Sequence, residues 1–267
     1  MSDYWNGKLA LITGASSGIG AAAAEKLASK GLKIILAARN SEKLQKVAEK
    51  IRSHGGEAYC FSCDLSKSEN RISLIKTIKS EIGIPDILIN SAGVGWYGYF
   101  SQMPWKIANE LLSLNIEATT HLTSLLLPDM LTLKRVRIIN IGSIAGKLLE
   151  QGIAIYSASK AYLDAFSKSL YRELRGTGIT VSILRAGAVK TNFFDNAADY
   201  KNGGRIPGEA LAIPPARVAN KVWSLVQFPR RYAYVPFYVS FSPLLETLFS
   251  WSIDLAGPIL LRHSQKS

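Results

Sequence analysis

Cysteine is scarce in this chain, which has only Cys60 and Cys63 among its 267 residues. The two thiols lie three residues apart in a run, 58–63, that has the pattern of a strand, so they point to opposite faces of a sheet. About 10 Å would separate them, which is too far for a disulfide. No second CxxC follows and the three histidines are scattered. We therefore expect two reduced thiols and no metal site.

Linkers, repeats and leader segments are also missing. No run rich in proline, glycine or serine, no block of like charge and no internal repeat divides the chain, which is 48% hydrophobic and 19% charged. This length and composition suffice for one sizeable core. We expect a catalytic domain over 1–241, with 242–267 as an amphipathic extension of the same domain. No basic and apolar leader precedes the first strand pattern, so a cytoplasmic location is expected.

Acidic residues are outnumbered by basic ones, 20 to 32, and the net charge is +12. A basic balance is typical of proteins that bind nucleic acid, anionic membranes or acidic small molecules. No segment resembles a helix that reads bases, and the cations are dispersed except around Arg230 and Arg231, so no nucleic-acid partner is expected. A phosphorylated cofactor with an acidic substrate or a membrane surface explains the charge most economically. A merely solvated basic surface is the alternative.

Short apolar runs alternate with helical patterns along the chain. The predicted strands cover 9–12, 33–38, 58–63, 87–89, 137–141, 180–184 and 232–236, and the helices between them include 41–53, 68–82, 104–127, 153–175 and 214–227. Continuous β-branched runs separated by helices indicate a parallel sheet covered on both faces. The predicted fold class is α/β, a doubly wound parallel sheet of about seven strands. Such sheets bind ligands beyond the carboxyl ends of their strands.

A glycine-rich turn, Thr13-Gly14-Ala15-Ser16-Ser17-Gly18-Ile19-Gly20, follows the first predicted strand. Glycine permits a tight turn and a close approach of the backbone to a pyrophosphate, which rests on the helix N-terminus. Glycine also serves packing alone in many such turns. The position directly after the first strand favours the nucleotide-binding interpretation.

Tyr156 and Lys160 lie one turn apart on a predicted helix, so their side chains share a face. A tyrosine with a pKa near ~10 exchanges protons poorly at neutral pH. A neighbouring ammonium favours the phenolate and lowers that pKa toward a useful range. The pair alone is weak support, because such pairs are common on solvated helices.

Five separated motifs together resemble the short-chain dehydrogenase/reductase family over roughly residues 8 to 195. They are Thr13-Gly-x-x-x-Gly18-x-Gly20, Asn90-Ser91-Ala92-Gly93, Asn115, Ser143 and Tyr156-x-x-x-Lys160. The resemblance implies a Rossmann fold and hydride transfer between a nicotinamide cofactor and a carbonyl or alcohol.

The resemblance also implies a role for each catalytic residue. Tyr156 would be the acid/base that protonates the carbonyl oxygen, and Ser143 would donate a hydrogen bond to that oxygen. Lys160 would lower the pKa of Tyr156 and hydrogen-bond the nicotinamide ribose. Asn115 would hold a water that links Lys160 to solvent.

The end of the second predicted strand bears on the choice of cofactor. NAD-binding Rossmann proteins usually place a carboxylate there, whereas an arginine accommodates the 2′-phosphate of NADP. Arg39 follows this strand and no carboxylate is present, so NADP(H) is expected, with a solvent-facing Arg39 as the alternative. The other expected cofactor contacts are Gly14, Ser16, Ser17, Gly18, Ile19, Gly20, Asn40, Asp64, Leu65, Asn90, Ala92, Gly93, Tyr156, Lys160, Gly187, Val189 and Thr191.

Apolar and aromatic residues occupy the positions that line the family's substrate cleft. They include Trp96, Leu149, Ile153 and Phe193, beside Ser143 and Tyr156. This lining favours a small hydrophobic carbonyl substrate over a sugar, unless several of these residues belong to the core. The segment from Thr191 to about Ile213 is expected to be a mobile lid.

The C-terminal segment carries a broad apolar face from Leu244 to Leu255. Crossing a bilayer is not expected, because Glu246 and Asp254 would each cost ~3 kcal/mol near its centre. Three uses stay open: covering the cleft, packing at a subunit interface, or lying on a membrane surface beside Arg230 and Arg231. The first two are favoured.

The predicted function is an NADPH-dependent reduction of a hydrophobic ketone or aldehyde. The alternative is a catalytically silent NADP-binding regulatory or scaffold protein. The family commonly pairs through the helices that hold Asn115 and Tyr156, which implies a homo-oligomer.

Overall fold

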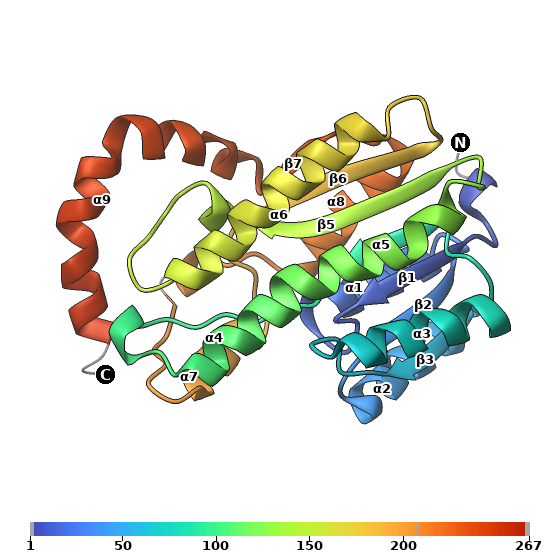
Figure 1. Cartoon of the computed structure of the whole chain (residues 1–267), viewed down its shortest axis with the longest axis horizontal. Coiled ribbons are helices and arrows are strands. Elements are labelled where there is room, and N and C mark those ends of the chain that lie inside the picture. Colours follow the sequence, from blue (N-terminus) through green and yellow to red (C-terminus); the bar gives the residue numbers. More distant parts are fainter. Residues whose placement is uncertain (1–2, 207, 265–267) are drawn as a thin grey trace.

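Seven parallel strands form the centre of the computed structural model, which describes residues 3–206 and 208–264 (Figure 1). Their order is β3-β2-β1-β4-β5-β6-β7, so the chain starts in the middle and winds outward in both directions. The strands are β1 (Leu9–Thr13), β2 (Lys33–Ala38), β3 (Ala58–Ser62), β4 (Ile87–Asn90), β5 (Val136–Ser143), β6 (Ile179–Ala186) and β7 (Tyr232–Val235). The predicted doubly wound sheet is confirmed, and its order reverses between β1 and β4.

Helices cover both faces of the sheet, as Figure 1 shows. One face packs against α1 (Gly18–Ala28), α2 (Ser41–Ser53) and α8 (Pro215–Gln227). The other packs against α3 (Ser68–Glu81), α5 (Ala118–Met130) and α6 (Ala154–Glu173). Alternate residues of one strand enter the two cores: Ile34 and Leu36 of β2 face α1, and Ile35 faces α3. Burial on both faces explains why the strands are apolar throughout.

The two cysteines lie on opposite sides of the sheet, as the strand pattern predicts. Cys60 packs against the core on the α1 side and Cys63 belongs to the core on the α3 side. Both thiols are free, and burial raises the pKa of Cys63 to about 11. Over the described residues, no cluster of three or more metal-ligating side chains occurs.

The helix predicted over 104–127 is not continuous. It consists of α4 (Trp105–Leu112), a π-helical turn (Ser113–Glu117) and α5, which runs three residues further than predicted. Asn115 lies in the π turn and is fully buried. Such a turn inserts one extra residue into the helical register, which apolar periodicity does not reveal.

The lid segment contains more regular structure than predicted. It begins with α7 (Phe193–Asp199) and includes a 3₁₀ turn, Glu209–Leu211. Ile213 then forms a parallel bridge with Val189 beside the sheet.

The C-terminal segment forms α9 (Ser242–Ser264), which follows a 3₁₀ turn, Phe237–Phe241. Phe249 has non-helical dihedral angles, so α9 is kinked there and does not present the one continuous face that the sequence predicted. It stands away from the sheet as an arc, red in Figure 1. Glu246 accepts a hydrogen bond from the Leu149 amide (3.1 Å), and the Gln151 side chain donates to the Ile253 carbonyl (3.2 Å).

These contacts tie α9 to the loop before α6. None of the helices in the described part of the chain is both long and apolar enough to traverse a bilayer. The division of the chain at residue 241 stays a prediction, and 265–267 lie outside the described residues.

A buried carboxylate joins α6 to the end of β6. Asp164, which is 3% exposed, contacts Lys147 (2.8 Å), Lys168 (3.0 Å) and Arg185, whose Nε donates at 2.6 Å. Burial opposes ionisation of Asp164, but the hydrogen bonds from Lys147, Lys168 and Arg185 outweigh it and lower the pKa of this carboxyl. The ion cluster therefore holds together the helix and the strand that flank the candidate site.

We expect Asp164→Asn to lower the free energy of unfolding at neutral pH by about 3 kcal/mol, because it leaves the buried Arg185 without its counter-charge. Since the folded-state pKa of Asp164 is lowered, the wild-type contribution is complete above the unfolded-state pKa, near ~4, and is lost as the pH falls through the folded-state pKa. Denaturant titrations across this pH range measure both effects.

The exposed Glu42, which pairs with Lys46, provides a control. Glu42→Gln should change stability by less than about 0.5 kcal/mol. Equal effects of the two substitutions would contradict the assigned role of Asp164.

Candidate active site

Ser143 and Tyr156 meet at the carboxyl end of the sheet. Ser143 is the last residue of β5, and Tyr156 lies in the first turn of α6. Their side chains interact, and the Ser143 Oγ also accepts a hydrogen bond from the Ala145 amide (3.1 Å). Two hydroxyls are thus held side by side, in an arrangement that can bind one carbonyl oxygen.

Burial raises the pKa of Tyr156 to about 12, and the hydrogen bond with Ser143 opposes this only in part. The direction is the reverse of the expected one, in which Lys160 lowers this pKa. The physical reason is desolvation, which disfavours the phenolate more than its neighbours stabilise it. The phenol is therefore fully protonated at neutral pH.

Lys160 lies one turn further along α6 and is 8% exposed. Its Nζ donates to the Ile141 carbonyl of β5 (3.1 Å) and lies 5.6 Å from the centroid of the Tyr156 ring. Burial lowers the pKa of Lys160 to about 8. The ammonium is thus next to the phenol, as the helical spacing predicted.

Asn115 holds the loop that follows β4. Its Oδ1 accepts from the Val94 amide (2.9 Å), and its Nδ2 donates to the Val94 carbonyl (3.0 Å) and to Ser159 Oγ (3.1 Å). A Cβ on Gly93 would lie 3.0 Å from Asn115 Oδ1 and 3.7 Å from Lys160 Nζ, so Asn115 and Lys160 border the same spot. The water link implied by the family resemblance stays a prediction.

The glycine turn has the geometry of a nucleotide cradle. Gly14 has φ +65°, and a Cβ there would lie 2.8 Å from Ala92 Cα, so only glycine allows this approach. A Cβ on Gly20 would overlap the Gly14 carbonyl, which keeps α1 close to β1. The Thr13 hydroxyl accepts from the amides of Ser91 (3.0 Å) and Ala92 (3.1 Å). Sequence reasoning gave Thr13 no such role.

The N-terminus of α1 carries no acidic residue in its first turn, and the Ser17 side chain does not cap it. Its backbone amides are therefore suited to an anion, and the turn fits the pyrophosphate of a dinucleotide. Ser16, Gly18 and Ile19 are half-buried around this end, and a Cβ on Gly18 would lie 2.9 Å from the Thr191 methyl group. The segment predicted to be a lid therefore begins directly over this helix end.

The residues expected at the adenosine end are already engaged with protein groups. Arg39 pairs with Glu110 of α4 (2.9 Å), and the Asn40 side chain caps α2 by accepting from the Lys43 amide (2.8 Å). Both Arg39 and Glu110 interact with Tyr200 at the end of α7, where burial raises the pKa of Tyr200 to about 12. Arg39 is paired but still exposed, with 55% of its side chain accessible to solvent, so the structure does not decide between the cofactor-binding and the solvent-facing interpretation.

Asp64 and Leu65 follow β3 at this end. The amide (3.0 Å) and hydroxyl (2.8 Å) of Ser66 both donate to Asp64. Burial opposes ionisation of Asp64, but these bonds outweigh it and lower its pKa. Leu65 is buried in the α3-side core.

Asn90 lies beneath the site instead of facing it. It is 3% exposed, and its Nδ2 donates to Asn140 (2.8 Å), which in turn donates to Ser167 (2.8 Å). The side chain thus links the end of β4 to β5 within the buried part of the sheet. The sequence analysis did not single out Asn140 and Ser167. Their only signal in the sequence is that each is a polar residue within an otherwise apolar pattern.

Gly187 and Val189 lie in the loop after β6. The Gly187 amide donates to the Val235 carbonyl of β7 (2.9 Å), and Val189 is buried. The loop is thereby held against the sheet before it reaches Thr191.

Aromatic residues cover the hydroxyl pair. The Phe193 ring lies 5.4 Å from that of Tyr156 and fills the space that a side chain on Gly95 would need. Ile153 and Trp96 are buried and line a hollow of about 10 Å³ beside Tyr156. The indole N–H of Trp96 donates a hydrogen bond to the Lys201 carbonyl (3.3 Å). Leu149 is 52% exposed and lies at the entrance, next to α9.

This fold and this set of residues define an oxidoreductase with a Rossmann nucleotide-binding sheet, and comparison with known proteins agrees. The family described as short chain dehydrogenase matches residues 8–202, so the chain belongs to the short-chain dehydrogenase/reductase family.

Three relatives illustrate the range of the family. The 3-oxoacyl-[acyl-carrier-protein] reductase FabG of Escherichia coli strain K12 is 34% identical over 200 residues, 75% of this chain and 81% of the relative. A metagenomic short-chain oxidoreductase in complex with NADP is 34% identical and superposes with a TM-score of 0.75, covering 88% of this chain and 98% of that one. One from Burkholderia phymatum in complex with NAD is 26% identical, with a TM-score of 0.83 and coverages of 94% and 95%.

The buried ammonium has a measurable consequence for stability. The pKa of Lys160 is lowered to about 8, so its charged form destabilises the fold at pH 7, and this penalty disappears as the pH rises from about 8 toward the unfolded-state pKa near ~10.5. We expect Lys160→Met to raise the free energy of unfolding at pH 7 by on the order of 2 kcal/mol, and by much less near pH 9.5.

Denaturant titrations at both pH values test this, with the exposed Lys76→Met as the control. If the difference in the free energy of unfolding between wild type and Lys160→Met did not depend on pH, burial would not lower the pKa of Lys160.

Proposed function

We propose that the protein reduces the carbonyl group of a hydrophobic ketone or aldehyde with NADPH, and that Tyr156 is the proton donor. The interacting side chains of Ser143 and Tyr156 beside the buried Lys160 support this most directly. The glycine turn and the bare N-terminus of α1 would hold the dinucleotide. When bound, the nicotinamide supplies the hydride.

The chain's own residues account for the proton. Ser143 donates a hydrogen bond to the carbonyl oxygen and orients it, and Tyr156 transfers its phenolic proton to that oxygen as the carbon accepts the hydride pair. The product is an alcohol, and the phenolate left behind is stabilised by the adjacent Lys160 ammonium. A pKa of about 12 keeps Tyr156 protonated before the step, as a proton donor must be.

The rival function is a catalytically silent NADP-binding regulatory or scaffold protein. Removal of the Tyr156 hydroxyl distinguishes the two proposals. A silent protein has no need of Asn115, Ser143, Tyr156 and Lys160 together. Tyr156→Phe keeps the ring that packs on Phe193 but removes the proton. We expect it to bind NADPH as wild type does and to lower kcat by roughly 10³-fold on hydrophobic ketones.

NADPH oxidation and NADPH fluorescence titration measure these two properties separately. A Tyr171→Phe variant, altered near the far end of α6, is the control. Wild-type turnover by Tyr156→Phe would refute the assignment, and an inactive wild type that binds NADPH over a broad ketone panel would favour the silent protein.

NADP(H) is proposed as the cofactor because Arg39 follows β2 and no carboxylate takes its place. Family members bind either dinucleotide, as the NADP and NAD complexes of the two solved relatives illustrate. In this chain Glu110 competes with a 2′-phosphate for the Arg39 guanidinium. Glu110 is thus expected to weaken the preference that Arg39 creates.

We expect Arg39→Ala to weaken NADPH binding roughly 10- to 100-fold and to leave NADH binding nearly unchanged, because only NADPH carries the phosphate. Glu110→Gln, which frees the guanidinium, should strengthen NADPH binding by about threefold. Calorimetric titration of wild type and both variants with NADPH and with NADH measures the ratio of the two affinities. Equal losses for NADPH and NADH in Arg39→Ala would contradict the assignment.

A lipophilic substrate is supported by the side chains at the site, since Phe193, Ile153 and Trp96 offer no polar group that matches a sugar. A 3-oxoacyl, steroid-like or xenobiotic carbonyl fits this description, and the name of the Escherichia coli relative favours the first. We further propose a cytoplasmic homo-oligomer that pairs through α5 and α6, where the exposed Tyr162 stacks on Phe166 (6.1 Å).

A further inference from the structure

A second and larger hollow lies away from Tyr156, at the β7 edge of the sheet, and has a volume of about 690 Å³. Its walls come from α6, α8, the ends of β6 and β7, and the 3₁₀ turn before α9. Seven cationic side chains and no acidic one line it: Lys147, Lys168, Arg172, Arg185, Lys221, Arg230 and Arg231.

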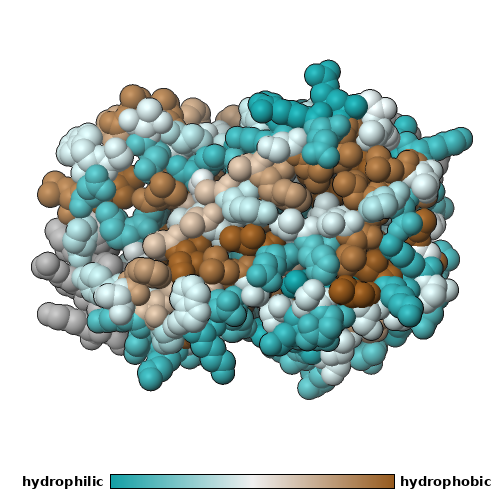
Figure 2. Space-filling model, in the orientation of Figure 1, coloured by the Kyte–Doolittle hydropathy of each residue, from teal (hydrophilic) through white to brown (hydrophobic). Residues whose placement is uncertain are grey.

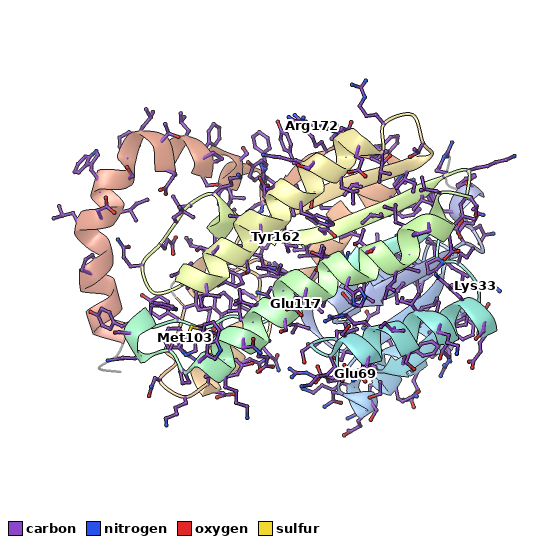
Figure 3. All side chains as sticks on the ribbon, viewed as in Figure 1. Lys33, Glu69, Met103, Glu117, Tyr162 and Arg172 are labelled. Carbon is purple, nitrogen blue, oxygen red and sulfur yellow. The ribbon has the colours of Figure 1, made fainter. Side chains whose placement is uncertain are left out.

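Most of this charge is not neutralised by the protein. Asp164 is shared by Lys147, Lys168 and Arg185. Within residues 3–206 and 208–264, Arg172, Lys221 and Arg230 have no carboxylate partner. Figure 3 labels Arg172 on the outer part of α6. A concave surface lined by unpaired cations is suited to several phosphate groups.

An exposed apolar surface continues from the rim of this hollow. Phe237 is 78% exposed and, with Ser240 and Pro243, also lines the hollow. The surface extends through α9, where Trp251 is 65% exposed, and its other exposed members are Tyr238, Phe241, Leu244, Leu245, Leu248, Phe249 and Leu255. Figure 2 shows hydrophobic side chains along the α9 arc and hydrophilic ones further along the same upper edge.

The large apolar side chains of this arc face solvent and are therefore free to bury against another apolar surface. A symmetric contact with a second copy that included the hollow would place its cations against those of the two-fold mate, and the repulsion opposes such an association. A partner that matches both the cationic hollow and the apolar arc must carry anionic phosphates next to hydrocarbon.

We propose that this face docks on an anionic phospholipid membrane. Lipid phosphates bind Arg172, Lys221, Arg230 and Arg231 at the hollow, while α9 and the preceding turn lie in the boundary between headgroups and acyl chains. The kink at Phe249 lets the arc follow the surface. The loop tied to α9 through Leu149 and Gln151 then lies near the lipid. Delivery of a lipophilic carbonyl from the bilayer is a consequence that rests on the proposed function; the docking does not.

Vesicle sedimentation of the full chain tests the docking without any use of activity. Wild type should sediment with phosphatidylcholine vesicles in which about one lipid in three is phosphatidylglycerol, and far less with phosphatidylcholine alone. Arg172→Gln with Arg230→Gln should weaken binding about fivefold for each charge, and so about 25-fold together. Leu248→Ser with Trp251→Ser should also release the protein.

Lys43→Gln with Lys76→Gln is the matched control, because it removes the same charge from exposed positions on α2 and α3 at the opposite edge of the sheet. It should bind as wild type does. Thermal unfolding of every variant excludes loss of fold as the cause. An equal loss in this control, or no sedimentation of wild type, overturns the proposal.

Trp251 reports on α9 directly. Brominated lipids should quench the fluorescence of wild type more than that of Trp251→Phe, which keeps the four other tryptophans. Equal quenching of the two proteins would mean that α9 does not enter the lipid. A mass measurement that detects dissociation of an oligomer in the Arg172 and Arg230 variant would assign this face to contacts between copies, and would likewise overturn the docking.

Discussion

The buried ammonium of Lys160 is the group on which the geometry of the site depends. It reaches across from α6 to the Ile141 carbonyl of β5, beside Gly93 and Asn115. A charge in such a place is costly, so the chain tolerates it only where surrounding dipoles are fixed. A Cβ on Gly146 would lie 2.7 Å from the Lys160 backbone, which indicates how closely the turn after β5 approaches α6. That approach brings the Ser143 hydroxyl to Tyr156.

The same desolvation gives the two titrating groups opposite shifts. The phenol is harder to ionise and the ammonium easier to neutralise than either is in water. A proton donor with a high pKa next to a cation that stabilises its conjugate base suits transfer to a developing alkoxide. In the proposed reaction, the rate advantage would come from the stabilisation of charge that appears during the step and not from a phenolate prepared in advance.

Contacts between distant segments link the ends of the site. Arg39 after β2, Glu110 of α4 and Tyr200 after α7 form one polar cluster, so the adenosine end and the lid share a side chain partner. At the other end, α9 is bound to the loop that carries Leu149. Both proposals, cofactor preference and membrane docking, concern charges that the fold leaves near its surface.

The local sequence pattern was sufficient to predict much of the fold and of the candidate site. The apolar runs predicted every strand within three residues at either end, because a strand buried on both faces must be apolar throughout. The motif residues Gly14, Ser143, Tyr156 and Lys160 fall at the carboxyl ends of strands or one turn into a helix. Parallel strands bring those ends to one edge, so their proximity follows from the element order.

The tertiary structure decided the rest. Arg39 and Glu110 are 71 residues apart, and no local pattern predicts their pairing. Asn90 is buried and bonds to the Asn140 side chain, and Asn115 holds the backbone of Val94. The π turn and the kink at Phe249 interrupt helices that the apolar periodicity continued. The pKa of Tyr156 is shifted in the direction opposite to the expected one. The sequence determined which groups are present and how they are spaced along the chain. Their ionisation and partners depend on how much water and which distant side chains surround them, and these are set only when the sheet and its helices have assembled.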